Sequence, residues 1–209
     1  AGYIIATAPR LVGTSIRLDF PTVTGTSNLM MAASLAEGRT IIENAAREPE
    51  ITDLANFINL MGGKISGLGT NLLVIDGAEE LIPVPYTALP DRIEAGTLLA
   101  AGIITGGDLL VKNCPVDGME AVFDKFKAVG ATLTIEGKNL VRVQGPEQIQ
   151  AVDVRTQPYP GFPTDMQAQM MALMTLSCGR AAISETIFEN RFMHVSELRR
   201  MGADIICEG

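Results

Sequence analysis

The chain has 209 residues, 47% of them hydrophobic, which is enough for one large hydrophobic core or two small ones. Its formal net charge of −8 argues against binding to nucleic acid or to anionic membranes, and no apolar run is long enough to span a membrane. Three cysteines at unrelated spacings predict neither a disulfide framework nor a metal site, and no signal peptide is visible, so we expect a soluble cytoplasmic protein.

The N-terminal half of the sequence predicts one mixed α/β unit. Residues 3–8 have the character of a strand returning from a hairpin whose partner is missing. Pro21 and Thr22 then open a small-residue helix that ends at Gly38, because proline and a hydroxyl side chain favour a helix start and glycine favours its end. A short apolar strand, a second helix ending at Gly62 and a hairpin closing at Gly77 follow.

The same order recurs twice more along the chain. The second unit opens at Pro90 and the third at Pro163. The glycines that end the two helices of a unit are 24, 23 and 23 residues apart: Gly38 and Gly62, Gly107 and Gly130, Gly179 and Gly202. A period this long, with helices and strands mixed, indicates a folded subdomain used repeatedly and an α/β fold class.

The second helix of each unit carries an apolar stripe, counted 11, 8, 7, 4 and 1 residues back from its last glycine. In the first unit these positions hold Ile51, Leu54, Ala55, Ile58 and Met61, and in the second Met119, Val122, Phe123, Phe126 and Val129. In the third unit the first two positions hold Arg191 and His194. An arginine at a core position suggests an anionic partner. The alternative, left open for His194 above all, is that this helix starts later or lies nearer to solvent.

The proline-rich stretch VPYTALPDR, residues 84–92, connects the first unit to the second. We predict a hinge here, with residues 1–88 forming one lobe of one unit and residues 89–209 forming a lobe of two units. The last unit is incomplete, because the strand expected over residues 204–207 lacks its hairpin partner. The two unpaired end strands are expected to fray, or to pair with another copy or with the missing half.

The three proline-led helix starts predict free amides and a positive dipole end, which suit an anion or a hydroxyl group. In the third, Thr164 or Asp165 can cap the helix. For an isolated aspartate in this place, capping alone is the favoured interpretation, and the rest of the chain decides whether a functional role is added.

Four stretches, AEGRTIIENAAREPEITDLANF, LPDRIEAGT, FPTDMQAQ and FENRFMHVSELRRMGA, resemble the UDP-N-acetylglucosamine enolpyruvyl transferase (1-carboxyvinyltransferase) family. The resemblance implies an inside-out α/β barrel of two domains with three units each. It also implies transfer of enolpyruvyl from phosphoenolpyruvate to the 3-hydroxyl of UDP-N-acetylglucosamine, the first committed step of peptidoglycan synthesis. In this family the reaction needs neither a metal nor another cofactor.

The resemblance assigns roles to individual residues. Asp165 matches the aspartate that contacts the sugar hydroxyl and is proposed to accept its proton, and Ile187 contacts the substrate. Arg191 lies near the reacting centre. The uridine nucleotide is lined by Phe20, Pro21, Thr22 and Val23, and further cleft residues are Glu48, Asp91, Arg92, Thr164 and Phe188. An alternative is that Glu48 and Arg92 pair across the domain junction.

Parts of the family pattern have no match in this sequence. The loop cysteine in its Cys-x-x-Gly-x-Arg-Pro context is absent, and Cys114 in KNCPVDG is interpreted as structural or incidental. The substrate-binding Lys-Asn pair and the later arginines are also absent, so about half of the family's chain is represented and the chain alone is expected to be inactive. The alternatives are enolpyruvylshikimate phosphate synthase, built from the same units, and a non-catalytic fragment that binds a sugar nucleotide.

Overall fold

The computed structural model describes residues 2–208 and separates into two units, Ala1–Leu89 and Pro90–Gly209. Each unit has a hydrophobic core of its own. No sheet continues from one unit into the other, because the strand that ends at Asp76 and the strand that begins at Asp108 belong to different sheets. None of the described helices combines the length and apolar character needed to cross a membrane.

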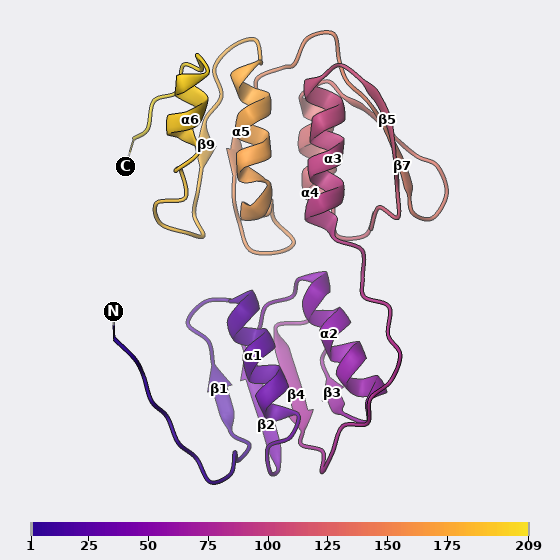
Figure 1. Ribbon diagram of the computed structural model, residues 1–209, viewed down its shortest axis with the longest axis vertical. Coiled ribbons are helices and arrows are strands. Elements are labelled where there is room, and N and C mark those ends of the chain that lie inside the picture. Colours follow the sequence, from indigo (N-terminus) through magenta and orange to yellow (C-terminus); the bar gives the residue numbers. More distant parts are fainter. Residues whose placement is uncertain (1, 209) are drawn as a thin grey trace. The chain divides into compact units, whose positions relative to one another are not determined.

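Unit 1 is a four-stranded sheet with two helices packed against it (Figure 1). Its elements are β1 (Ser15–Arg17), α1 (Val23–Ala33), β2 (Arg39–Glu43), α2 (Pro49–Leu60), β3 (Lys64–Ser66) and β4 (Leu72–Asp76). The strand order is β1-β2-β4-β3, with β1 parallel to β2 and the other pairs antiparallel. This is the predicted order of helices, strand and hairpin.

Unit 2 contains the second and third repeats. Its elements are α3 (Arg92–Ile104), β5 (Asp108–Lys112), α4 (Glu120–Ala128), β6 (Thr132–Ile135), β7 (Leu140–Gln144), β8 (Val154–Arg155), the 3-10 helix η1 (Thr164–Met166), α5 (Gln167–Thr175), β9 (Ile183–Ser184) and α6 (Val195–Arg200). Strands β5, β7 and β6 form an antiparallel sheet, and β8 pairs with β9 in parallel. Helix α3 packs against α5 and against β5 and β7 (Figure 1).

The apolar stripes of the second helices are confirmed in the first two repeats. In α2 the side chains of Ile51, Ala55 and Ile58 are buried, and Leu54 and Met61 pack against the same core. All five stripe positions of the second repeat are buried, from Met119 to Val129. Burial of such a stripe against a sheet is the main source of stability for a short helix.

The third repeat departs from this pattern because its second helix begins late. The loops before α2, α4 and α6 have 5, 7 and 10 residues, while the helices have 12, 9 and 6, so loop and helix together keep nearly the same length. The predicted place of Arg191 and His194 on the helix stripe is therefore wrong, and the alternative of a later start is correct. The helices still end alike, at glycines with φ near 100°, a conformation that a side chain would strain: Gly62, Gly130 and Gly202.

An asparagine marks each of these loops. Asn44, Asn113 and Asn190 have φ values of 57°, 56° and 58°, the left-handed region that asparagine tolerates better than most residues. Asn44 follows β2 directly and Asn113 follows β5, whereas Asn190 lies six residues beyond β9. The third loop is therefore longer because residues that are helical in the other repeats belong to the loop here, not because residues are inserted.

The strands expected at the two ends of the chain are not formed. Residues 3–8 and 204–207 have no regular structure, and Tyr3 and Ile4 are almost fully exposed. A strand needs a neighbouring strand to satisfy its backbone groups, and within residues 2–208 none pairs with either segment. The C-terminal segment is tied down instead by the Arg199 guanidinium, which donates hydrogen bonds to the Ile205 carbonyl.

The proline-rich connection is bound to unit 1 over most of its length. The Tyr86 hydroxyl donates to Asp53 Oδ1 at 2.7 Å, and its ring lies 4.7 Å from that of Phe57. The Leu89 amide donates to Asp53 Oδ2 at 3.3 Å. These contacts fix Tyr86 and Leu89 to unit 1.

Candidate functional site

The third helix start is built differently from the first two. Thr22 caps α1 and Asp91 caps α3, as their positions predict, through bonds to Gly25 and to Ile93 and Glu94. In the described chain no side chain caps η1 or α5, so the expected cap by Thr164 or Asp165 is wrong. Both side chains instead turn toward the loop that follows β9, where their oxygens accept hydrogen bonds from the Arg191 guanidinium.

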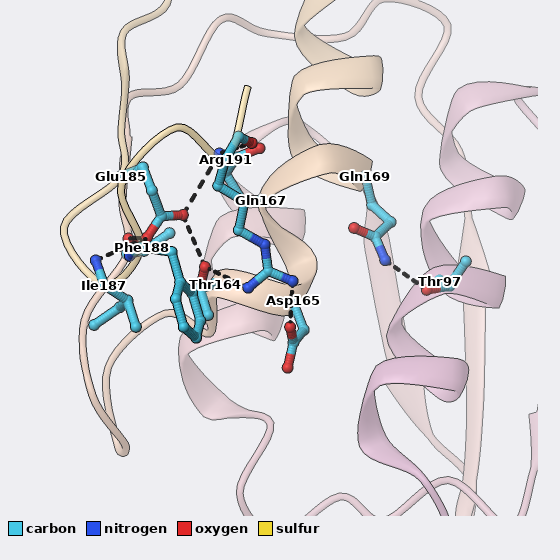
Figure 2. Close-up of polar contacts among 10 residues, drawn as sticks. Thr97, Thr164, Asp165, Gln167, Gln169, Glu185, Ile187, Phe188 and Arg191 are labelled. Atoms are coloured by element: carbon cyan, nitrogen blue, oxygen red, sulfur yellow. Dashed lines mark hydrogen bonds and ion pairs between the residues drawn. The ribbon is translucent and has the colours of Figure 1, made fainter. Parts of the chain in front are cut away.

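The backbone that presents these two side chains is held firmly against α3. A Cβ atom added to Gly96 of α3 would lie 2.9 Å from the sulfur of Met166, which is completely buried at the end of η1. One turn further on, Gln169 donates to the Thr97 hydroxyl at 2.9 Å (Figure 2). The lack of a side chain at Gly96 thus allows the turn bearing Asp165 to pack closely on α3.

Asp165 forms an ion pair with Arg191, which lies in the loop before α6. Nη2 of Arg191 donates to Asp165 Oδ1 at 2.6 Å, and Nη1 donates to the Thr164 hydroxyl at 2.9 Å (Figure 2). The guanidinium carbon lies 5.1 Å from the centre of the Phe188 ring. The Asp165 side chain is 53% exposed, so its carboxylate remains accessible to a ligand while Arg191 fixes one of its oxygens.

Glu185 connects η1 to the loop that follows β9. Its Oε2 accepts from the Thr164 hydroxyl at 2.8 Å, and its Oε1 accepts from the Ile187 amide at 2.8 Å and from the Phe188 amide at 3.2 Å (Figure 2). Oε1 also accepts from the Thr156 hydroxyl at 2.8 Å. Burial alone would raise the pKa of Glu185, but these donors together lower it below the usual range. Glu185 is therefore an anion at neutral pH.

Glu185 was not predicted from the sequence. It lies outside the apolar stripes and outside the three helix starts, and the run SETIFEN carries no spacing that separates it from Glu189. Its importance arises from contacts with residues 20 to 30 positions away in the chain, including Thr156 and Thr164. No local pattern could have identified it.

Two apolar side chains lie on the same loop as Arg191. Ile187 and Phe188 are 37% and 55% exposed while their amides are fixed by Glu185. The site therefore presents the Asp165 carboxylate on η1 beside a loop that carries a guanidinium and two accessible apolar side chains and whose amides are held by Glu185. Such a mixture can bind a ligand that has a hydroxyl or an anion beside an apolar surface.

His194 is the residue immediately before α6. Burial first and the positive charge of Arg191 second lower the pKa of His194. Its Nε2 is buried and has no hydrogen-bond partner within residues 2–208. The imidazole is therefore neutral at physiological pH.

The parallel strand pairs explain where the predicted residues lie within each unit. In unit 2, β8 leads to η1 and β9 leads to the Arg191 loop, so both arrive at the carboxyl edge of one parallel pair. This brings together Thr164, Asp165, Ile187, Phe188 and Arg191. In unit 1, β1 and β2 similarly carry residues 20–23 and Glu48 to one edge of that sheet, where Asn44 donates to the Leu18 carbonyl at 3.0 Å.

The remaining predicted residues are found at helix starts. Phe20 is 67% exposed, and the Thr22 hydroxyl is engaged as the cap of α1. Glu48 precedes α2, and its Oε2 has no hydrogen-bond partner among the described residues. Asp91 caps α3, and Arg92 is the largely buried first residue of that helix. Within unit 2, the structure therefore unites the predicted residues of the third repeat with one another.

Cys114 is not part of this site. It is completely buried in the core of unit 2, with its sulfur 3.6 Å from that of Met119, and burial raises the pKa of its thiol to about 11. A thiol of this kind is a poor nucleophile at neutral pH, which supports the structural interpretation. Among the residues that the structure describes, no group of three or more His, Cys, Asp or Glu side chains could hold a metal ion.

The repeated units are those of enolpyruvyl transferases. The solved enolpyruvyl transferase NikO from Streptomyces tendae has the same fold, with a TM-score of 0.83 over 97% of this chain and 51% of its own, at 22% identity. A family model described as EPSP synthase (3-phosphoshikimate 1-carboxyvinyltransferase) matches residues 2–209, and the chain belongs to this family.

Within the family, the chain is similar to the UDP-N-acetylglucosamine 1-carboxyvinyltransferases. It is 59% identical over its whole length to the protein of this name from Thermodesulfovibrio yellowstonii, and 55% identical over 208 residues to one from Caldanaerobacter subterraneus. In both comparisons the chain spans 50% of the relative's length, so it corresponds to about half of these enzymes.

Proposed function

We propose that this chain forms part of an enzyme that transfers enolpyruvyl from phosphoenolpyruvate to the 3-hydroxyl of UDP-N-acetylglucosamine. The reaction releases phosphate and belongs to peptidoglycan synthesis, which places the enzyme in the cytoplasm. The observation that carries the proposal is the Asp165–Arg191 pair: a half-exposed carboxylate held at one oxygen, beside a guanidinium.

Each group of the site has a role in this reaction. The Asp165 carboxylate accepts the hydrogen of the attacking sugar hydroxyl as the new C–O bond forms, in the manner of a general base. Arg191 fixes the carboxylate and supplies positive charge beside the two anionic substrates. Ile187 contacts the sugar nucleotide, and Phe188 limits the freedom of the guanidinium.

The residues of unit 1 complete the proposal. Residues 20–23 line the uridine nucleotide, and Glu48, Asp91 and Arg92 belong to the cleft. Residues 1–88 correspond to the last unit of the first lobe of the family fold, and residues 89–209 to two units of the second lobe. Similarity to two transferases at 59% and 55% identity supports these assignments.

A chimaera provides the test. In the Thermodesulfovibrio yellowstonii relative, the half that matches this chain is replaced by residues 1–209. Phosphate release is then measured with phosphoenolpyruvate and one of two acceptors, UDP-N-acetylglucosamine or shikimate 3-phosphate. We expect turnover with UDP-N-acetylglucosamine and none with shikimate 3-phosphate. A folded chimaera that uses shikimate 3-phosphate alone, or that releases no phosphate, would contradict the proposal. For the chain on its own we expect binding of the sugar nucleotide without turnover.

A further inference from the structure

Glu185 occupies a central place among the polar groups of the site, although it does not contact Asp165 or Arg191 through any hydrogen bond of its side chain. It receives bonds from the end of β8, from η1, from α5 and from its own loop, at Thr156, Thr164, Gln167 and the Ile187 and Phe188 amides. A residue that contacts so many segments could simply hold the loop in place. It could also orient the Thr164 hydroxyl and, through it, the Arg191 guanidinium.

The chemistry of the Thr164 hydroxyl distinguishes these possibilities. A guanidinium can only donate, so the Thr164 oxygen must accept the bond from Arg191 Nη1 at 2.9 Å. A hydroxyl has one hydrogen, which is then available for Glu185 Oε2 at 2.8 Å. Both bonds exist together only if Oε2 accepts, and Oε1 accepts from the Thr156 hydroxyl and from the Ile187 and Phe188 amides. With both oxygens acting as acceptors, neither carries a proton, so Glu185 is ionised. The lowered pKa of Glu185 agrees with this requirement.

We propose that Glu185 is a positioning residue: as an anion it orients the Thr164 hydroxyl, and the hydroxyl in turn holds the Arg191 guanidinium against Asp165. What Arg191 and Asp165 then do to a substrate rests on the function proposed above, but the orientation itself does not. The arrangement is a relay with a fixed direction, from Arg191 through Thr164 to Glu185, and a second arm from Arg191 to Asp165.

Glu185→Gln tests the relay with almost no change in size. The Oε1 side faces three donors, so the amide oxygen should remain there and keep the Ile187 and Phe188 amides bonded. The amide NH2 group then faces Thr164, whose oxygen receives two donors while its hydrogen has no acceptor. The loop should therefore persist while the guanidinium loses its fixed partner.

Thr164→Val removes the hydroxyl that connects Glu185 to Arg191, so it should also leave the Arg191 guanidinium without this fixed partner. Thr186→Val is the matched control, because the Thr186 hydroxyl ties the same loop to the Thr156 carbonyl at 2.5 Å without any bond to Thr164 or Arg191. If Glu185→Gln fails to fold, the comparison of Thr164→Val with Thr186→Val still decides the question.

The primary measurement is 15N NMR of the Arg191 side chain in the 209-residue protein, assigned through Arg191→Lys. In the wild-type chain, slow rotation of the held guanidinium should give separate Nη signals. We expect Glu185→Gln and Thr164→Val to merge or broaden them, with hydrogen exchange of the Ile187 and Phe188 amides unchanged, and Thr186→Val to preserve them. Unchanged Arg191 signals in Glu185→Gln, or an equal loss in Thr186→Val, would overturn the proposal.

The chimaera adds a functional readout. We expect Glu185→Gln to lower kcat roughly 10-fold while the KM for UDP-N-acetylglucosamine changes less than about 2-fold, because a misplaced charge affects the reacting geometry more than ground-state binding. If the wild-type chimaera does not turn over, the proposed function fails, whereas the NMR comparison still decides the role of Glu185. A wild-type kcat in Glu185→Gln would contradict the positioning role.

Discussion

Asp165→Asn separates a chemical role of Asp165 from a structural one. The amide has nearly the same size as the carboxylate, and its carbonyl can still accept the bond from Arg191 Nη2 and from a substrate hydroxyl. It cannot accept a proton. If Asp165 is the general base, turnover of the chimaera should fall roughly 10²-fold or more, with a much smaller change in the KM for UDP-N-acetylglucosamine.

The structure also sets the expected change in stability. Asp165 caps no helix, so the substitution removes no cap, and its ion pair joins side chains that are 53% and 36% exposed. Pairs of this exposure contribute about 0–1 kcal/mol because water screens them and ordering the side chains has an entropic cost. We therefore expect the free energy of unfolding to fall by less than about 1 kcal/mol and Tm by no more than a few degrees.

A matched control is available in the same unit. Asp108 forms an ion pair with Arg142 at 2.9 Å, and the two side chains are 46% and 41% exposed. Asp108→Asn should therefore change Tm about as much as Asp165→Asn does, without any effect on kcat. The assays are steady-state phosphate release and thermal unfolding of both variants. Wild-type turnover in Asp165→Asn, or an equal loss in Asp108→Asn, would refute the base assignment.

Three further outcomes are expected. Iodoacetamide at pH 8 should modify the two exposed cysteines but not Cys114, whose buried thiol has a pKa of about 11, and mass spectrometry showing early Cys114 labelling would contradict this. Tyr86→Phe keeps the ring contact with Phe57 but loses the bond to Asp53, so urea unfolding should show a loss of about 1 kcal/mol, and an unchanged midpoint would argue against the tether. Because the pKa of Glu185 is lowered in the folded state, its stabilising contribution is present above the usual glutamate range and is lost as the pH falls through the lowered value. The stability difference between wild type and Glu185→Gln should therefore narrow toward acid pH, and a difference independent of pH would exclude an ionised Glu185.

Much of the fold could be predicted because each repeat carries its own local signals. A cap such as Thr22 or Asp91 acts within three residues, and an apolar stripe acts within one helix, so both are visible in the sequence. The glycines that end the second helices follow from a backbone requirement that no other residue meets as well. These features place the helices and the hairpins of the first two repeats.

The site could be predicted only in part. Capping preferences favour Asp165 as a helix cap, but they do not include a guanidinium 26 positions later in the chain, and the ion pair prevails. The helix stripe likewise extends the second helix of the third repeat back to Arg191, because the spacing counted back from Gly202 does not show that these residues belong to the loop before α6. Glu185 depends wholly on contacts between distant segments. The Asp165–Arg191 pair and the role of Glu185 could therefore not be predicted, because both depend on polar contacts between residues far apart in the sequence.

The exchange of length between loop and helix has a consequence for how this fold can acquire binding sites. Since α2, α4 and α6 all end at an equivalent glycine, residues can pass from the start of the helix to the preceding loop without displacing the hairpin that follows. The third repeat shows that six helical residues suffice when the loop is held by an internal carboxylate. The first turn of the second helix in each repeat can thus be replaced by loop. The loops before α2 and α4 are therefore places where a protein engineer could graft a new recognition loop while keeping the scaffold intact.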